Sequence, residues 1–216
     1  MIYDAAHSFN IKINDESVLN FGDLSILSFH ATKIFNTIEG GAIFSKEKKI
    51  KQKLDSLINF GFNENKTDAI AGLNAKMNEL QAAYGLLLLE IVDNEIKKRK
   101  LIARIYKRNL KHVKGIRFLE EIEGVTYNYS YFPIFIDHKL YGKSRDEVYK
   151  LLVNHNIFPK KYFYPLISKF TPYKNLFTAS SSNLPIAEKI SKQVLCLPIH
   201  SNLQEYEYDK IIELLK

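Results

Sequence analysis

A long, uninterrupted helical pattern between residues 77 and 110 constrains the fold of this chain more than any other feature of its sequence. Apolar residues recur there at three- and four-residue spacing, first at Met77, Leu80, Tyr84, Leu87, Leu88, Ile91 and Val92 and then from residue 96 to residue 110. This period places them on one face of an α-helix. A helix of that length can connect two domains, so we expect one domain before it and another after it.

The segment before this helix has the pattern of short buried strands. Apolar runs bounded by polar residues or glycine occur at residues 1–3, 24–29 and 41–44, and they predict strands. Residues 46–60 have helical spacing, and the Asn-rich stretch 61–72 is typical of a loop. The first domain is therefore expected to contain both helix and sheet.

The segment after residue 115 again alternates between strand and helix patterns. Aromatic and β-branched residues predict a strand over 127–136. A helix is expected over 144–154, with Ser144 as its N-cap and Glu147 completing a capping box. Two closing helices are expected over 187–194 and 203–215. The second domain is therefore also expected to be of the α/β type.

Polar and basic residues follow two of the predicted strands. Asp4 and His7 follow the first, and Ser28, His30 and Lys33 follow the second. Ligands of α/β sheets bind just beyond the carboxyl ends of the strands. A lysine amine there can condense with an aldehyde, and a nearby carboxylate can keep a pyridine nitrogen protonated. The alternative is that Lys33 is an ordinary surface lysine.

Five segments, in a fixed order along the chain, resemble one family of enzymes. They are SFHATKIFNTIEGGA at 28–42, YDAAHSF at 3–9, GLNAKMNELQAA at 72–83, YFYPL at 162–166 and LCLPI at 195–199. The first resembles the pyridoxal 5′-phosphate (PLP) lysine motif of the DegT/DnrJ/EryC1/StrS aminotransferases, and the second resembles their pyridine-nitrogen motif. The resemblance covers essentially the whole chain.

The resemblance implies an α/β fold, the PLP-transferase fold type I of aspartate aminotransferase. It implies that residues 1–95 form the C-terminal part of the large PLP-binding domain and that residues 96–216 form the small C-terminal domain. The family's large domain begins well upstream and carries a Gly-Ser/Thr turn that cradles the cofactor phosphate. We therefore expect this chain to be a fragment, with an unpaired sheet edge and an exposed apolar face.

The resemblance also implies roles for individual residues. Lys33 holds PLP as a Schiff base and moves the proton between cofactor and substrate. Asp4 pairs with the pyridinium nitrogen, and His7 lies close to the ring. Ser28 donates to the cofactor phosphate. Asn74 reaches the phosphate of the neighbouring subunit's cofactor, which implies a homodimer with shared active sites.

Tyr162 and Tyr164 belong to a stretch that lies near the substrate sugar in the family, and we expect them to bind substrate. Less specific alternatives remain for several of these residues. His7 can simply occupy a polar strand end, Asn74 can cap the long helix, and the two tyrosines can belong to the core.

The function implied is transfer of an amino group, with glutamate as donor, to a nucleotide-linked keto sugar. The style of the lysine motif favours a dTDP-4-keto-6-deoxyhexose, used in the biosynthesis of surface polysaccharides. An alternative is a truncated, non-catalytic remnant or partner subunit of such an enzyme. A related PLP-dependent sugar dehydratase is a further alternative, but those relatives have histidine in place of the lysine, so Lys33 argues against it.

Composition excludes little but agrees with this interpretation. The net charge of +7 permits an anionic partner, yet only five arginines occur, so we expect no nucleic-acid binding. The longest apolar run, residues 84–89, is too short to span a membrane. Cys196 is the only cysteine, which fits a reducing cytoplasm. We expect no metal ion in the site.

Overall fold

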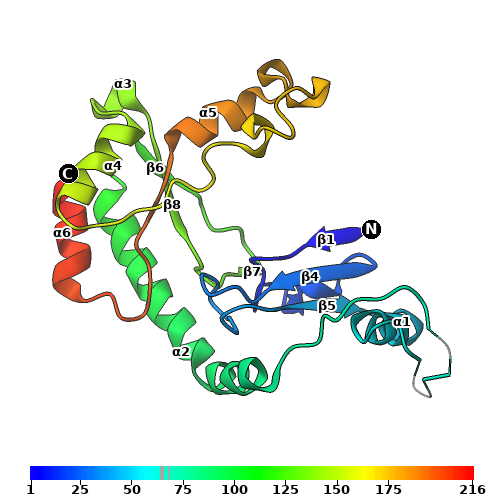
Figure 1. The fold of residues 1–216 in the computed structure, drawn as a ribbon. Helices are drawn as coiled ribbons and strands as arrows, with labels where there is room; N and C mark the ends of the chain where they lie inside the picture. Colours follow the sequence, from blue (N-terminus) through cyan, green and yellow to red (C-terminus); the bar gives the residue numbers. More distant parts are fainter. Residues whose placement is uncertain (64–65, 68) are drawn as a thin grey trace. The chain divides into compact units, whose positions relative to one another are not determined.

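The structure is a computed structural model that describes residues 1–63, 66–67 and 69–216. It divides into two compact units, each with its own sheet (Figure 1). Residues 1–96 and 122–130 form the first unit, and residues 97–121 and 131–216 form the second. The domain boundary expected between residues 95 and 96 stays a prediction. The return of residues 122–130 to the first unit was not predicted from the sequence.

The main sheet of the first unit carries the polar residues singled out in the sequence. Its three strands, in the order β1-β4-β5, are β1 (Ile2–Asp4), β4 (Leu24–Ser28) and β5 (Gly41–Ser45). β1 runs parallel to β4, whereas β5 is antiparallel to β4, with Ser28 opposite Gly41. Because β1 and β4 are parallel, their carboxyl ends, Asp4 and Ser28, lie at the same end of the sheet.

The expected edge and apolar face are both present in this sheet. Among the described residues, β1 is paired with β4 alone. Ile2, Ile26 and Ile43 share one face through the strand register, and their side chains are 64, 43 and 46% exposed. Apolar side chains on the face of a sheet are usually covered by another layer. This face therefore lacks a second layer in the part of the chain that the structure describes.

The remaining elements of the first unit frame this sheet. A small antiparallel sheet has the order β3-β2-β7, formed by β2 (Lys12–Ile13), β3 (Glu16–Ser17) and β7 (Val125–Thr126). A 3-10 turn, η1 (Val18–Asn20), leads toward β4. The helix expected over 46–60 is present as α1 (Lys48–Ile58).

The long helix predicted between residues 77 and 110 is confirmed as α2 (Glu79–Leu110). It contributes residues to both units. Its N-terminal part packs against the loop between β4 and β5. Ile34 and Phe35 of that loop are buried with Val92 of α2. Phe35 stacks on Phe9 at 4.5 Å between ring centroids and meets Phe29 edge-on at 4.8 Å. The apolar residues that follow Lys33 thus fix the loop to the core.

Gly85 of α2 lies close to this loop, and we expect Gly85→Ala to destabilise the protein. A Cβ at this position would lie 2.9 Å from Cγ2 of Thr37, which is only 2% exposed. Alanine normally stabilises a helix by about 1 kcal/mol over glycine, but overpacking costs about 1–3 kcal/mol. Urea unfolding is expected to show a net loss of about 1 kcal/mol.

The double variant Gly85→Ala with Thr37→Ser provides the control, since serine lacks the Cγ2 methyl group. It is expected to recover most of the loss, because serine keeps the hydroxyl that in Thr37 donates to the carbonyl of Glu39 at 2.7 Å. A Gly85→Ala protein more stable than the wild type would show that helix propensity outweighs the close contact at this site.

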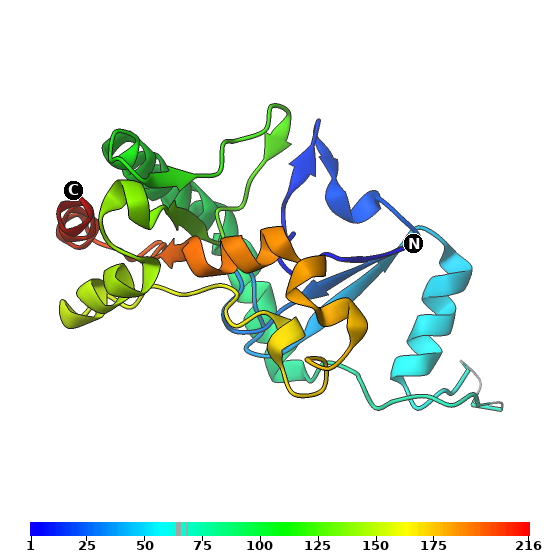
Figure 2. The same ribbon diagram turned by 90° about the horizontal axis from the view of Figure 1, so that it is seen from above.

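The second unit is built on an antiparallel sheet in the order β6-β8-β9, formed by β6 (Ile116–Phe118), β8 (Phe132–Ile136) and β9 (Val194–Leu197). Its helices, besides the C-terminal part of α2, are α3 (His138–Tyr141), α4 (Arg145–Asn154), α5 (Pro185–Gln193) and α6 (Glu205–Leu215). The segment before α5, yellow to orange in Figure 2, contains the 3-10 turns η2 (Ile167–Lys169), η3 (Phe177–Ala179) and η4 (Ser181–Asn183).

The core of the second unit includes Tyr106, Ile134, Leu152 and Leu195, which are fully buried. The capping box predicted at the start of α4 is present: the Ser144 side chain accepts from the Glu147 backbone, and the Glu147 side chain accepts in return. The α/β character expected for this part of the chain is therefore confirmed. Within the described part of the chain, no helix is both long enough and apolar enough to cross a membrane.

Two predicted boundaries in this region were wrong. The strand expected over 127–136 begins only at Phe132, because Tyr129 has a φ of 53°, a left-handed conformation that no strand accommodates. The helix expected over 187–194 begins earlier, at Pro185, and ends at Gln193. Val194 instead starts β9, whose residues are all buried. A short apolar run has the same pattern in a buried strand and in a buried helix.

Candidate active site

The structure brings together three of the residues singled out in the sequence: Asp4, His7 and Lys33. Asp4 ends β1, His7 lies in the turn that follows, and Lys33 lies in the loop after β4. The Nζ atom of Lys33 is 3.1 Å from Nε2 of His7 and 3.5 Å from its Nδ1. The carboxylate of Asp4 acts electrostatically on both side chains. The cluster is therefore an amine, an imidazole and a carboxylate at one end of the sheet.

Backbone hydrogen bonds hold the lysine loop in a compact turn. The amide of Lys33 donates to the carbonyl of His30 at 2.9 Å, and the amide of Thr37 donates to that of Phe29, also at 2.9 Å. Gly40 closes the loop with a φ of 154°, and a Cβ there would come within 2.3 Å of the Thr37 hydroxyl. Phe35 anchors the loop in the core. The side chain of Lys33 is half-buried and lies against the His7 ring.

Asn128 holds the turn that carries His7, and sequence reasoning missed it. Its amide nitrogen donates to the carbonyls of His7 at 2.9 Å and Phe9 at 2.8 Å, and the residue is only 4% exposed. A buried amide that satisfies two backbone carbonyls fixes the turn after β1. Asn128 is more than a hundred residues away along the chain, in a stretch expected to be strand, so no local pattern could identify it.

Burial and nearby charges set the protonation states of Lys33 and His7. Burial lowers the pKa of the Lys33 ammonium, and the negative charge of Asp4 opposes that shift. Burial also lowers the pKa of His7; the positive charge of Lys33 adds to the effect, while Asp4 again opposes it. His7 is therefore neutral at pH 7 and can accept a hydrogen bond from the Lys33 ammonium. The arrangement favours an amine that loses its proton more readily than an exposed lysine.

Removing the charge of Asp4 is expected to shift the titration of Lys33 to lower pH. The carboxylate raises the pKa of Lys33, so Asp4→Asn removes that support while burial continues to lower the pKa. More of the amine is then neutral at any given pH. The pH dependence of Lys33 acetylation, followed by peptide mass spectrometry, measures this. Asp55→Asn, a change at an exposed carboxylate of α1, serves as control; a profile displaced to higher pH in Asp4→Asn would contradict the expectation.

Ser28 lies at the end of β4 beside the lysine loop. Its hydroxyl oxygen accepts from the amide of His30 at 3.3 Å, and Nδ1 of His30 lies 2.9 Å from the hydroxyl of Thr32. These contacts order the first turn of the loop. The Ser28 hydroxyl lies at the same sheet end as Asp4, because β1 and β4 are parallel.

Asn74 lies in the segment that leads from α1 to α2. Its backbone pairs with that of Asn59, and the residue is exposed. The alternative in which it caps α2 is wrong, because Asn78 occupies that position: its side-chain oxygen accepts from the amide of Gln81 at 2.9 Å. The contact of Asn74 with a phosphate stays a prediction.

Tyr162 and Tyr164 lie in the second unit, and neither belongs to its buried core. Tyr162 is partly exposed and meets Tyr131 edge-on at 5.2 Å, and Tyr164 is 50% exposed. Tyr164 lies under the guanidinium of Arg145, which is 4.7 Å from the ring centroid. Two half-exposed aromatic rings are suited to contact a ligand.

The cluster in the first unit matches the chemistry of an aldehyde cofactor with a pyridine ring. A half-buried amine can condense with the aldehyde, and a carboxylate at the neighbouring strand end can hold a protonated ring nitrogen. The hydroxyl of Ser28 is a group that can donate to a phosphate. Within the described residues, no group of three or more His, Cys, Asp and Glu side chains could hold a metal ion.

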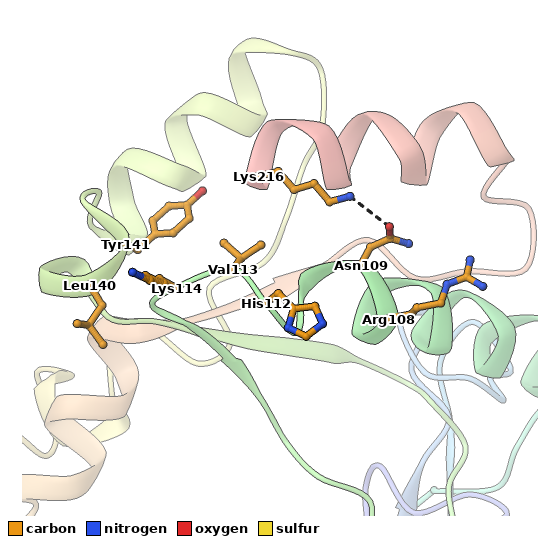
Figure 3. Close-up of a pocket in the computed structure, with 8 residues that line it drawn as sticks. All are labelled: Arg108, Asn109, His112, Val113, Lys114, Leu140, Tyr141 and Lys216. Carbon is orange, nitrogen blue, oxygen red and sulfur yellow. Dashed lines mark hydrogen bonds between the residues drawn. The ribbon is translucent and has the colours of Figure 1, made fainter.

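A cavity of about 620 Å³ lies elsewhere, in the second unit (Figure 3). It is lined by Arg108, Asn109, His112, Val113, Lys114, Leu140, Tyr141 and Lys216. Its basic side chains do not converge: Lys216 donates to Asn109 at 3.3 Å, whereas Arg108 and Lys114 lie at opposite ends of the cavity. It contains none of the residues predicted for the active site.

Comparison with known proteins gives a consistent result. The model of the DegT/DnrJ/EryC1/StrS aminotransferase family matches residues 1–216. The chain is 42% identical over 216 residues to dTDP-4-amino-4,6-dideoxy-D-glucose transaminase from Shigella dysenteriae, a match that covers 100% of this chain and 58% of the relative. The chain thus spans little more than half the length of that relative.

Solved structures show the same fold. DesI, crystallised with its TDP-sugar product, is 28% identical with a TM-score of 0.91; the match covers 99% of this chain and 54% of DesI. The PLP form of Spr1654 from Streptococcus pneumoniae is 24% identical with a TM-score of 0.88, over 100% of this chain and 56% of Spr1654. The predicted fold, PLP-transferase fold type I with part of the large domain, is confirmed.

Proposed function

The chain belongs to the DegT/DnrJ/EryC1/StrS aminotransferase family, whose members depend on PLP, and on that premise we propose that it serves PLP-dependent transamination of a nucleotide-linked keto sugar. One observation carries the proposal: the amine of Lys33 lies 3.1 Å from His7, at the sheet end where Asp4 terminates the neighbouring parallel strand. Attachment of an aldehyde cofactor requires a neutral amine, which the lowered pKa of Lys33 favours, and the carboxylate of Asp4 can hold the protonated ring nitrogen of that cofactor.

The residues of the cluster have distinct roles in this proposal. Bound PLP supplies an aldehyde and a pyridine ring that withdraws electrons from the reacting carbon. Lys33 holds the cofactor and then carries the proton between the reacting carbons. Asp4 keeps the ring nitrogen protonated, and neutral His7 orients the Lys33 amine and borders the ring. Ser28 donates to the phosphate, and Asn74 reaches the phosphate bound by a second copy of the chain in a homodimer.

The proposed substrate is a dTDP-4-keto-6-deoxyhexose, with glutamate as amino donor. The 42% identity to a dTDP-4-amino-4,6-dideoxy-D-glucose transaminase supports this choice. Tyr162 and Tyr164 are proposed to contact the nucleotide sugar through their exposed rings. The setting proposed is the cytoplasmic synthesis of sugars for surface polysaccharides.

A second candidate function is that of a non-catalytic partner subunit of such an enzyme. The small number of candidate phosphate-binding residues favours this function. Among the residues that the structure describes, only Ser28 and Asn74 are proposed to contact the cofactor phosphate. Such a subunit would keep the fold and its interaction surface without turnover.

Amino transfer from glutamate to dTDP-4-keto-6-deoxyglucose separates the two candidates. The purified chain, supplied with PLP, is expected to form 2-oxoglutarate and an amino sugar in equal amounts, measured by mass spectrometry. Lys33→Ala is the control and is expected to form neither. A chain that attaches PLP through Lys33 but forms no product would support the partner subunit instead.

A further inference from the structure

Arg145, the first residue of α4, is buried to an unusual degree for a charged residue. It is 2% exposed, and its Nη1 donates to the carbonyls of Ser191 at 3.0 Å and Val194 at 3.1 Å. Its Nε donates to Oδ1 of Asp146 at 2.9 Å. A cation in the first turn of a helix opposes the helix dipole, so the position is not explained by the stability of α4.

The face of the same guanidinium lies over the ring of Tyr164, with 4.7 Å between the guanidinium carbon and the ring centroid. Tyr164 is half-exposed, so this contact adds little to the hydrophobic core. Instead, the stacking of Arg145 restricts the orientation of the Tyr164 ring, which faces solvent. Arginine combines in-plane donors with a flat face for stacking, and lysine has no equivalent.

A second link ties the same segment to α4. Oδ1 of Asp146, the atom that accepts from Arg145, also lies 2.6 Å from Nζ of Lys161, and that ammonium lies 4.1 Å from the ring centroid of Tyr149. The hydrogen bond from Lys161 and the charge of Arg145 lower the pKa of the Asp146 carboxyl. Asp146 is therefore charged at neutral pH and joins the two cations.

The start of the segment is held by its backbone. Lys160 and Cys196 of β9 exchange hydrogen bonds of 3.0 and 2.8 Å. The segment 160–164 is thus fixed at Lys160 by the sheet, at Lys161 by Asp146 and at Tyr164 by Arg145. Tyr162, between these points, keeps its partly exposed ring.

We propose that Arg145 is a positioning residue for substrate: through Tyr164 and Asp146, it holds segment 161–164 in the conformation that receives the nucleotide sugar. This inference rests on the proposed function, in which Tyr162 and Tyr164 contact that substrate. Arg145 itself does not touch the substrate.

The first test examines the ring in the absence of ligand. The chain is labelled with 3-fluorotyrosine, and the ¹⁹F resonance of Tyr164 is assigned by its loss in Tyr164→Phe. Arg145→Lys is expected to move this resonance. Arg117→Lys is the matched control, since Arg117 is an exposed arginine that lies over Phe135 in the same unit. A Tyr164 resonance that stays in place in Arg145→Lys overturns the proposal.

The second test measures binding of dTDP-glucose by calorimetry. Tyr164→Leu, at a half-exposed position, and Arg145→Lys are each expected to raise Kd about three- to tenfold. Because both variants remove the contact between Arg145 and Tyr164, the double variant is expected to raise Kd by less than the product of the two single increases. Arg117→Lys, at the exposed arginine over Phe135, is the control and is expected to bind like the wild type.

The outcomes separate the inference from the proposed function. Wild-type affinity in Arg145→Lys, or losses that multiply in the double variant, overturns the positioning role while the substrate assignment stands. If the wild-type chain does not bind dTDP-glucose, the substrate assignment fails, and with it the positioning role for substrate, whatever the ¹⁹F resonance shows.

Discussion

Replacing Lys33 with alanine is expected to abolish specific attachment of PLP to the chain. After incubation with PLP and reduction with borohydride, peptide mass spectrometry is expected to find the cofactor on the wild-type peptide that contains Lys33. The visible absorption band of the attached cofactor is expected to disappear in Lys33→Ala. The physical reason is that burial lowers the pKa of this amine, so it is neutral more often than an exposed lysine.

Lys46→Ala is the matched control, because Lys46 is an exposed lysine that follows β5 in the same unit. It is expected to leave both the labelled peptide and the absorption band unchanged. Labelling spread evenly over exposed lysines, with no preference for Lys33, would mean that the cluster does not hold PLP in this chain.

The second large effect is expected from Phe35→Ala, which removes the anchor of the lysine loop. Phe35 is 5% exposed and packs between Phe9 and Phe29. Truncation of a buried phenylalanine costs about 3–5 kcal/mol, through lost transfer free energy and the cavity left behind. Urea unfolding followed by circular dichroism is expected to show a free energy of unfolding that is lower by that amount.

Phe177→Ala makes the same chemical change at a ring that is 87% exposed. Its effect on the free energy of unfolding is expected to stay within about 0.5 kcal/mol. Equal losses in the two variants would show that the Phe9, Phe29 and Phe35 rings do not form a stabilising cluster.

The sequence identified most elements by their periodicity and failed at particular boundaries. The long helix was found because its apolar residues repeat over many turns, and the start of α4 was found because Ser144 and Glu147 have capping-box spacing. The end of α5 and the start of β9 were not found. Val194 to Leu197 are all buried, and such a short apolar run carries no period of its own.

The candidate site was predicted only in part, for a similar reason. Motif resemblance singled out Asp4, His7 and Lys33, and each lies next to a strand end that the local pattern also indicated. Asn128 was missed because its contacts, to the carbonyls of His7 and Phe9, join segments far apart in the chain. The stacking of Arg145 on Tyr164 is likewise a contact between segments that no spacing rule connects.

The sequence by itself determined the long helix, the two α/β regions and the family, because periodicity and motifs are local properties of the chain. Only the tertiary structure decided that the Lys33 amine lies beside His7, that Asn128 holds the turn between β1 and the cluster, and that the pKa of Lys33 is lowered. The physical reason is that burial and electrostatic interaction depend on distances across the fold, which strand pairing and core packing set.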